Sequence, residues 1–259
     1  MKQMKKWMLL LSLAAAAACG KIDPTISYGE VSMGNPDGEQ FIYMDSGVAY
    51  KIVEQQCEGN PLTCDRVLIQ CDVLKHSAHL KTSTKTYEVY DIRLLQFREV
   101  KIKNPISTET QIGTDSYLGT DPIKFSTGWI SGKNLNVFAQ WYEVDGSNVE
   151  HRINLCFEQA RSHGDTLCFS LRHNAFDETP PYTKASSADA GGGSAAQDKK
   201  YVVKSDYYSF SLKNLLPEGK STIPIKITWK WYRDDDVNQQ ALDNFSLEGV
   251  YYNEEDKTE

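Results

Sequence analysis

Segments in which apolar and polar residues alternate recur along most of the chain, and they restrict the fold more than any other feature of the sequence. Every second residue is apolar in residues 67–73, 135–141 and 225–231. This period of two is typical of β-strands with one buried face. No window keeps a period of 3.6 residues, so the sequence predicts an all-β protein in which helices are minor.

The N-terminus has the pattern of a secretory signal. Lys2, Lys5 and Lys6 precede an uncharged, largely apolar run over residues 7–18. This run is too short to span a bilayer as a helix. Small residues then lead into Cys19, as in the lipobox at which signal peptidase II cleaves, although Ala16 stands where leucine is usual. We therefore predict a lipoprotein signal peptide over residues 1–18, with diacylglycerol and palmitate on Cys19.

An ordinary secretory signal is the alternative, but it would need a small-x-small cleavage site and no cysteine at this position. A lipid anchor would place the protein in the cell envelope, and we expect an outer-membrane lipoprotein. The sequence is compatible with a protein that faces the periplasm and with one that faces the cell surface.

The charge balance argues against nucleic acid as a partner. The formal net charge is −7, and removal of the three lysines of the signal peptide changes it to −10. No cluster of Lys and Arg follows the signal peptide, whereas phosphate binding needs one. The expected partners are the membrane, through the lipid anchor, and an unidentified protein or glycan.

Turn residues divide the strand signals into two series. Residues 19–38 contain many Gly, Pro and Ser residues and are predicted to be a flexible tether. Several strand signals follow within residues 39–104, which fits a small OB-like barrel. These signals cover residues 41–44, 48–53, 66–73 and 86–100.

The second series predicts a β-sandwich. Residues 105–120 show little periodicity and are predicted to be an interdomain linker. Strand signals separated by turn residues then fill residues 121–252 and fit a β-sandwich of about seven strands. A mobile insertion is expected at residues 180–200 and a disordered tail at residues 253–259.

Five cysteines remain beyond the lipidated one, enough for two disulfides and one thiol in an oxidising compartment. Cys57 and Cys64 bracket a short loop that can bring them within bonding distance, so we predict a disulfide between them. Cys71 shares the phase of its apolar neighbours and is interpreted as a buried side chain.

The second predicted disulfide joins Cys156 and Cys168. If Leu155 faces Phe169 across a hairpin, Cys156 stands directly opposite Cys168, since the residue numbers of both pairs have the same sum. A bulged turn at Gly164 would shift the register by two and leave the cysteines diagonal to each other.

Metal sites fit the sequence poorly. A zinc site would combine the three cysteines of residues 57–71 with His76 or His79, but six residues lie between successive cysteines, whereas zinc knuckles have two to four there. The two histidines are interpreted as solvated loop residues.

Asp234, Asp236 and Asn238 mimic the first ligands of a calcium loop. Gln239 and Phe245, however, replace its glycine and its final glutamate. The sequence also lacks a G-x-S-x-G motif. We expect no catalytic residues, no metal and no cofactor.

Aromatic residues are the better binding candidates. Phe138 and Tyr142 lie on the phase of their strand opposite to the apolar residues, so we predict that they belong to an exposed binding surface. Further candidates for it are Tyr207, Tyr251 and Tyr252. Four tryptophans share the apolar phase and are expected in the core: Trp129, Trp141, Trp229 and Trp231.

Five short motifs give the second half a recognisable order. They are DPIK at 121–124, WISG at 129–132, LNV at 135–137, HRINL at 151–155 and LRHNA at 171–175. In order and spacing the chain resembles the NigD-like lipoproteins. That resemblance implies a lipobox, an OB-like domain and a C-terminal β-sandwich, with no catalytic residues. It also implies a role in bacteriocin immunity, which was suggested for the family.

These observations predict a non-enzymatic, envelope-anchored lipoprotein that acts by binding, with immunity as the role that the resemblance implies. The alternative is a carbohydrate-binding accessory of a glycan-uptake system, which would need exposed aromatic platforms flanked by polar side chains. A purely structural envelope component would show neither a pocket nor a platform.

Overall fold

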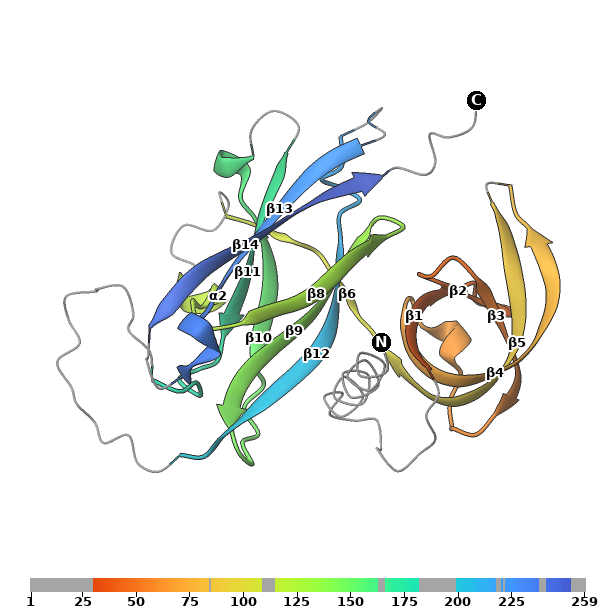
Figure 1. Ribbon diagram of the computed structural model, residues 1–259, viewed down its shortest axis with the longest axis horizontal. Helices are drawn as coiled ribbons and strands as arrows, with labels where there is room; N and C mark the ends of the chain where they lie inside the picture. Colours follow the sequence, from red (N-terminus) through yellow and green to blue (C-terminus); the bar gives the residue numbers. More distant parts are fainter. Residues whose placement is uncertain are drawn as a thin grey trace, which may run out of the picture. The chain divides into compact units, whose positions relative to one another are not determined.

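The computed structural model describes two compact units, which meet in sequence between Ile102 and Lys103 (Figure 1). The described residues are 30–83, 85–108, 115–162, 166–181, 199–217, 220, 222–237 and 241–252. The predicted signal peptide, Cys19 and the predicted tail lie outside these ranges, as does most of the predicted insertion. Within the described residues, no helix is long and apolar enough to cross a membrane.

The first unit is a closed five-stranded barrel, which confirms the small barrel predicted from the sequence. Its strands are β1 (Glu30–Pro36), β2 (Phe41–Met44), β3 (Ala49–Gln55), β4 (Val67–Lys81) and β5 (Thr86–Glu99), in the order β1-β2-β3-β5-β4. Only β3 and β5 pair in parallel. Three register shifts between β4 and β5 let these long strands curve around the barrel.

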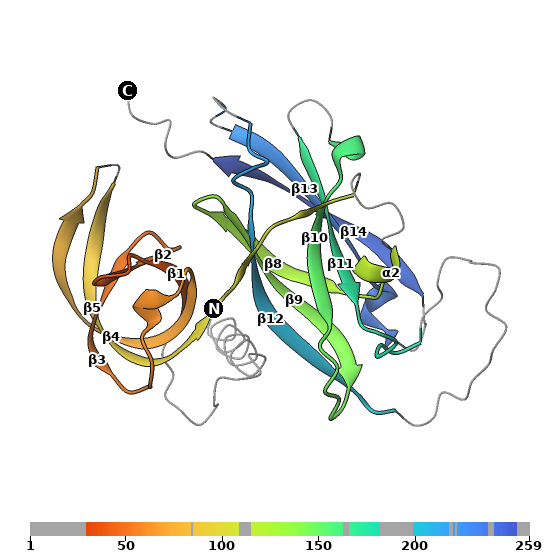
Figure 2. The ribbon, with the colours of Figure 1, turned by 180° about the vertical axis from the view of Figure 1, so that it is seen from behind.

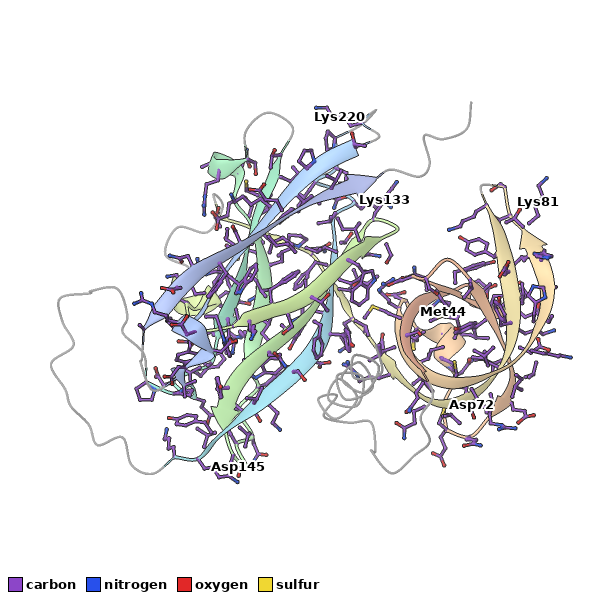
Figure 3. The ribbon with its side chains drawn as sticks, in the orientation of Figure 1. Met44, Asp72, Lys81, Lys133, Asp145 and Lys220 are labelled. Atoms are coloured by element: carbon purple, nitrogen blue, oxygen red, sulfur yellow. The ribbon has the colours of Figure 1, made fainter. Side chains whose placement is uncertain are left out.

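Alternate side chains of these strands fill the barrel interior. Met44 points inward in Figure 3 and is buried. It belongs to a core that also contains Ile42, Tyr50, Val67, Ile69, Cys71, Ile92 and Leu94. Each buried aliphatic side chain stabilises the barrel by about 1.5–3 kcal/mol. Cys71 is thus a core residue, as predicted.

The predicted tether ends earlier than residue 38, because β1 occupies Glu30–Pro36. Gly34 and Asp37, two of its residues, have structural roles in the barrel. A Cβ on Gly34 would lie 2.8 Å from the Met44 sulfur, so the strand needs glycine to approach β2 closely. The Asp37 carboxylate then accepts hydrogen bonds from the backbone N–H groups of Glu39, Gln40 and Phe41, which forms the turn into β2.

β4 is also longer than predicted and runs to Lys81, so His76 and His79 lie on a strand and not in a loop. Both are exposed, and their rings are 5.0 Å apart. The alternation stops at Val73 because neither face of the strand is buried beyond that point.

The second unit is a two-sheet sandwich. Its five-stranded sheet has the order β14-β13-β11-β10-β7 and its four-stranded sheet the order β6-β12-β9-β8 (Figures 1 and 2). The strands are β6 (Ile102–Lys103), β7 (Ile106–Ser107), β8 (Lys124–Ser131), β9 (Asn134–Val144), β10 (Arg152–Phe157), β11 (Leu167–Asn174), β12 (Tyr201–Ser211), β13 (Thr222–Tyr232) and β14 (Leu242–Tyr252). One hydrophobic core fills the space between the two sheets. It contains, among others, Val137, Leu155, Phe169, Leu171, Phe210 and Ile225.

The predicted linker at residues 105–120 is wrong for the residues that the structure describes there. β7 pairs in parallel with β10, and the short helix α2 (Asp115–Leu118) contributes the buried Leu118. These elements belong to the sandwich unit. They escaped prediction because two-residue strands and a four-residue helix are too short to show periodicity.

Candidate binding surfaces

Three aromatic side chains, among them the predicted Phe138, lie together on the outer face of the four-stranded sheet. Phe138 and Tyr207 are half-buried cross-strand neighbours, with ring centroids 4.7 Å apart. Trp129 lies beside Tyr207 at 6.2 Å. We call Trp129, Phe138 and Tyr207 the aromatic strip.

Trp129 was expected in the core, and a bulge explains why it is not. The register of β8 against β9 shifts between Phe125 and Thr127. This extra residue reverses the phase, so Ile130 packs against the core and Trp129 faces outward with Phe138. Sequence alternation alone could not reveal the bulge.

The rings of the aromatic strip are tilted against one another. The planes of Phe138 and Tyr207 differ by 38° and those of Trp129 and Tyr207 by 69°. They do not form the flat platform on which a sugar ring stacks.

Tyr142 lies apart from the aromatic strip, in a cluster at the end of β13. Its ring stacks on Trp231 at 5.5 Å with an interplanar angle of 10°, and it meets Tyr232 edge-on. Trp231 Nε1 donates to Asp235 Oδ1 at 2.6 Å, and Lys124 Nζ lies 2.7 Å from the same oxygen. Burial raises the pKa of Tyr142, and Asp235 adds to this shift. Phe138 and Tyr142 thus contact different groups of aromatic rings.

The acidic turn after β13 has a structural role in this cluster. Asp234 and Asp235 both adopt positive φ angles, 52° and 58°. The strained turn directs the Asp235 carboxylate to Trp231 and Lys124. The hydrogen bond from Lys124, together with that from Trp231, lowers the pKa of Asp235 against the opposing effect of burial. A carboxylate held in this way anchors the turn.

A buried histidine pair lies inside the sandwich, where HRINL and LRHNA meet. His151 Nδ1 is 3.0 Å from His173 Nε2, and His173 Nδ1 is 2.8 Å from the carbonyl oxygen of Pro122. Because that oxygen can only accept, His173 donates through Nδ1 and accepts at Nε2, and His151 is the donor between the rings. His151 Nε2 then faces Glu178 Oε2 at 3.7 Å.

Burial and the neighbouring His151 lower the pKa of His173 to about 4, against opposing effects of Pro122 and Asp121. His173 is therefore neutral at pH 7. The ring of Trp141 lies beside the pair, 6.5 Å from the ring of His151 and 6.3 Å from that of His173. The geometry of the pair fits an internal hydrogen-bonded support of the sandwich.

The segment that contains DPIK is attached to LRHNA by further hydrogen bonds. Arg172 Nε donates to the Gly119 oxygen, Asn174 Nδ2 to the Tyr117 oxygen, and the Asp121 N–H to the His173 oxygen. The Ala175 N–H donates to Asp121 Oδ2. Two motifs that are far apart in sequence thus form one hydrogen-bonded unit.

A polar cleft of about 150 Å³ opens on the outer face of the five-stranded sheet. Ser170 and Thr228 are direct cross-strand neighbours there. Ser170 is buried, and its hydroxyl has no hydrogen-bond partner among the described residues. The cleft is also lined by Arg161, Arg172, Lys230 and Asn244. It can accommodate a small polar group.

The predicted disulfides are absent, since no disulfide joins any cysteine that the structure describes. In β10 and β11, Cys156 faces Ser170 and Phe157 faces Phe169, which is the shifted register. The assumed pairing of Leu155 with Phe169 was therefore wrong. Cys57 and Cys64 pack against the barrel core, and burial raises the pKa of both thiols.

Comparison with known proteins identifies the second unit. Residues 104–188 match the family model of the NigD-like C-terminal beta sandwich domain. The sandwich unit thus contains a NigD-like C-terminal beta sandwich domain. The match covers both HRINL and LRHNA, whose histidines form the buried pair.

Solved structures share the fold of this chain. One is a NigD-like immunity protein from Bacteroides caccae, 14% identical, which covers 89% of this chain and 99% of its own with a TM-score of 0.53. A protein of unknown function from Bacteroides vulgatus is 15% identical with a TM-score of 0.57, over 86% of this chain and 91% of its own. Comparison with curated proteins finds no match.

Proposed function

We propose that this NigD-like protein is an envelope lipoprotein that acts by binding another protein, in an immunity-type role. The observation that carries the proposal is the NigD-like sandwich, in a chain whose fold resembles an immunity protein of Bacteroides caccae over 89% of its length. Lipidation of Cys19 would hold both β-domains at the membrane, where a bacteriocin acts.

The aromatic strip is the proposed contact for the partner. Aromatic side chains are enriched at the positions that contribute most of the binding free energy of an interface, because they offer a large rigid contact area at low entropic cost. Phe138 lies on β9, where it pairs with Tyr207 of β12 on one side and with Thr127 of β8 on the other.

The experiment is a survival assay with the bacteriocin encoded nearest to the gene. Deletion of the gene should make cells sensitive, and the wild-type gene should restore survival. Unchanged survival of the deletion strain would count against immunity. A glycan-utilisation gene cluster in place of a bacteriocin cluster would favour the carbohydrate-binding alternative.

Two variants separate anchoring from binding. Cys19→Ala should leave the membrane fraction and fail to protect, because one missing anchor removes the protein from its place of action. Phe138→Ala should stay in the membrane fraction and lower protection at least tenfold. The matched control is Val203→Ala on β12, which removes an apolar side chain that is 54% exposed. Equal protection by Phe138→Ala and Val203→Ala would exclude the aromatic strip as the contact for the partner.

A further inference from the structure

The last strand of the sandwich, β14, is an edge strand with an unusual amount of exposed apolar surface. Among the residues that the structure describes, it pairs only with β13 of the five-stranded sheet (Figures 1 and 2), along eleven consecutive residue pairs. Phe245, Leu247 and Val250 are 36%, 45% and 44% exposed. A long edge strand of this kind is a ready template for another strand.

β14 carries none of the usual protections of an edge. Residues 242–252 contain no lysine and no proline, and their register against β13 has no bulge. The two acids of the strand are neutralised across the ladder. Asp243 pairs with Arg233 at 2.9 Å and Glu248 pairs with Lys226 at 2.9 Å. The edge therefore presents little net charge to an approaching strand.

Phe245 and Leu247 continue the inner face of the sheet, whereas Val250 lies on the opposite phase of the strand. Phe245 is opposite Trp229 and stacks on it at 6.0 Å, and Leu247 is opposite Ile227. Gly249 follows on the same face, and a Cβ built there would meet no atom within 4 Å. This face thus consists of two large side chains followed by a gap.

We propose that β14 pairs with β14 of a second copy of this chain, antiparallel about a two-fold axis at Leu247. In this register Phe245 lies opposite Gly249 of the copy, so each ring fills the gap that the glycine leaves. Leu247 lies opposite Leu247 of the copy. Residues that stand directly opposite each other in this pairing point to the same side of the sheet. The inner faces of both strands therefore stay on the same side.

Charge is compatible with the same register. Glu248 lies opposite Ser246 of the copy, and Asp243 lies opposite Tyr251. No like charges face each other, whereas a shift by one residue on each strand would place Glu248 opposite Glu248. Pairing joins the two five-stranded sheets into one continuous sheet. The inference does not depend on the proposed function.

The first test is the mass in solution of the protein comprising residues 20–259, which keeps every residue that the structure describes. Sedimentation equilibrium should show two chains for the wild type and for the control Val203→Lys. Leu247→Lys should raise the dissociation constant at least tenfold, with an unchanged circular dichroism spectrum. A monomeric wild type, or equal dissociation constants for both lysine variants, would overturn the proposal.

The second test reports the register. Leu247→Cys places two thiols opposite each other across the axis, within the range that a disulfide needs. Under mild oxidation this variant should form a covalent dimer, while Val203→Cys should remain a single chain on a non-reducing gel. A dimeric wild type whose Leu247→Cys variant does not cross-link would show that another surface forms the contact.

Discussion

At the scale of single residues, the partners of buried polar groups decide what the side chains do. Arg66 is fully buried at the start of β4, where its Nη1 donates to Asn35 and its Nη2 is ion-paired with Asp45. The guanidinium thus ties β1 and the β2–β3 turn to β4. The sequence showed Arg66 only as a polar residue in an alternating strand, because its partners lie more than twenty residues away.

The buried His173 predicts a loss of stability in acid. Its pKa is lowered to about 4 in the folded protein, from about 6.5 when unfolded. The unfolded state therefore binds the proton more tightly, and stability is full above pH 6.5 and falls as the pH drops towards 4. At pH 4.5 the expected loss is about 2–3 kcal/mol relative to pH 7.

Urea unfolding at several pH values measures this effect. His173→Gln should reduce the acid slope, while the exposed His79→Gln should leave it unchanged. Since His151, Asp121 and Glu178 surround His173, part of the slope will remain in the variant. Equal slopes for the wild type and His173→Gln would contradict the prediction.

The register of β10 and β11 predicts the state of two cysteines. Cys156 faces Ser170, and the Glu158 N–H donates to the Cys168 oxygen, so Cys168 is opposite Glu158. A disulfide would require the strands to slip by two residues. Peptide mapping without reduction should recover Cys156 and Cys168 in separate peptides. A linked peptide would show that the register differs.

At the scale of elements, alternation predicted strands well wherever one face is buried and the pairing is regular. β9 and β13 follow it along their inner residues. The bulge in β8 interrupted the alternation, since one extra residue moved Trp129 to the outer face. The sequence placed residues 242–252 in the sandwich but did not delimit β14 as a strand of its own, because Gly249 interrupts its apolar face.

The segment after α2 gives a prediction about glycine. Gly119 has a φ of +70°, and a Cβ there would lie 2.2 Å from the His173 carbonyl oxygen, which belongs to rigid backbone. Gly119→Ala should destabilise the sandwich by more than about 2 kcal/mol, through clash and strain together. Differential scanning calorimetry gives the shift in melting temperature.

The matched control is Gly132→Ala in the turn before β9. Its φ is also positive, +53°, but nothing lies within 4 Å of the added Cβ. Gly132→Ala should lower the free energy of unfolding by about 1 kcal/mol, because of the left-handed backbone alone. Similar losses for both variants would show that the contact with β11 does not constrain Gly119.

At the scale of the whole molecule, the sequence predicted the two β-domains and their order. It placed the boundaries wrongly at both ends of the barrel, because glycine and proline suggested flexible chain where close packing uses them. The aromatic strip could be predicted only in part. Phe138 followed from its phase, whereas Trp129 depended on a bulge and Tyr142 on the distant Trp231.

Two separate cores predict two unfolding transitions. Ile92 lies in the barrel core and Leu155 in the sandwich core, and both are fully buried. Replacement of either by alanine removes a similar volume and should cost about 2–5 kcal/mol. Ile92→Ala should lower only one of two calorimetric transitions, and Leu155→Ala only the other. If each variant moved both transitions together, the units would unfold as one cooperative block, and the stability of each domain would depend on contacts beyond its own core.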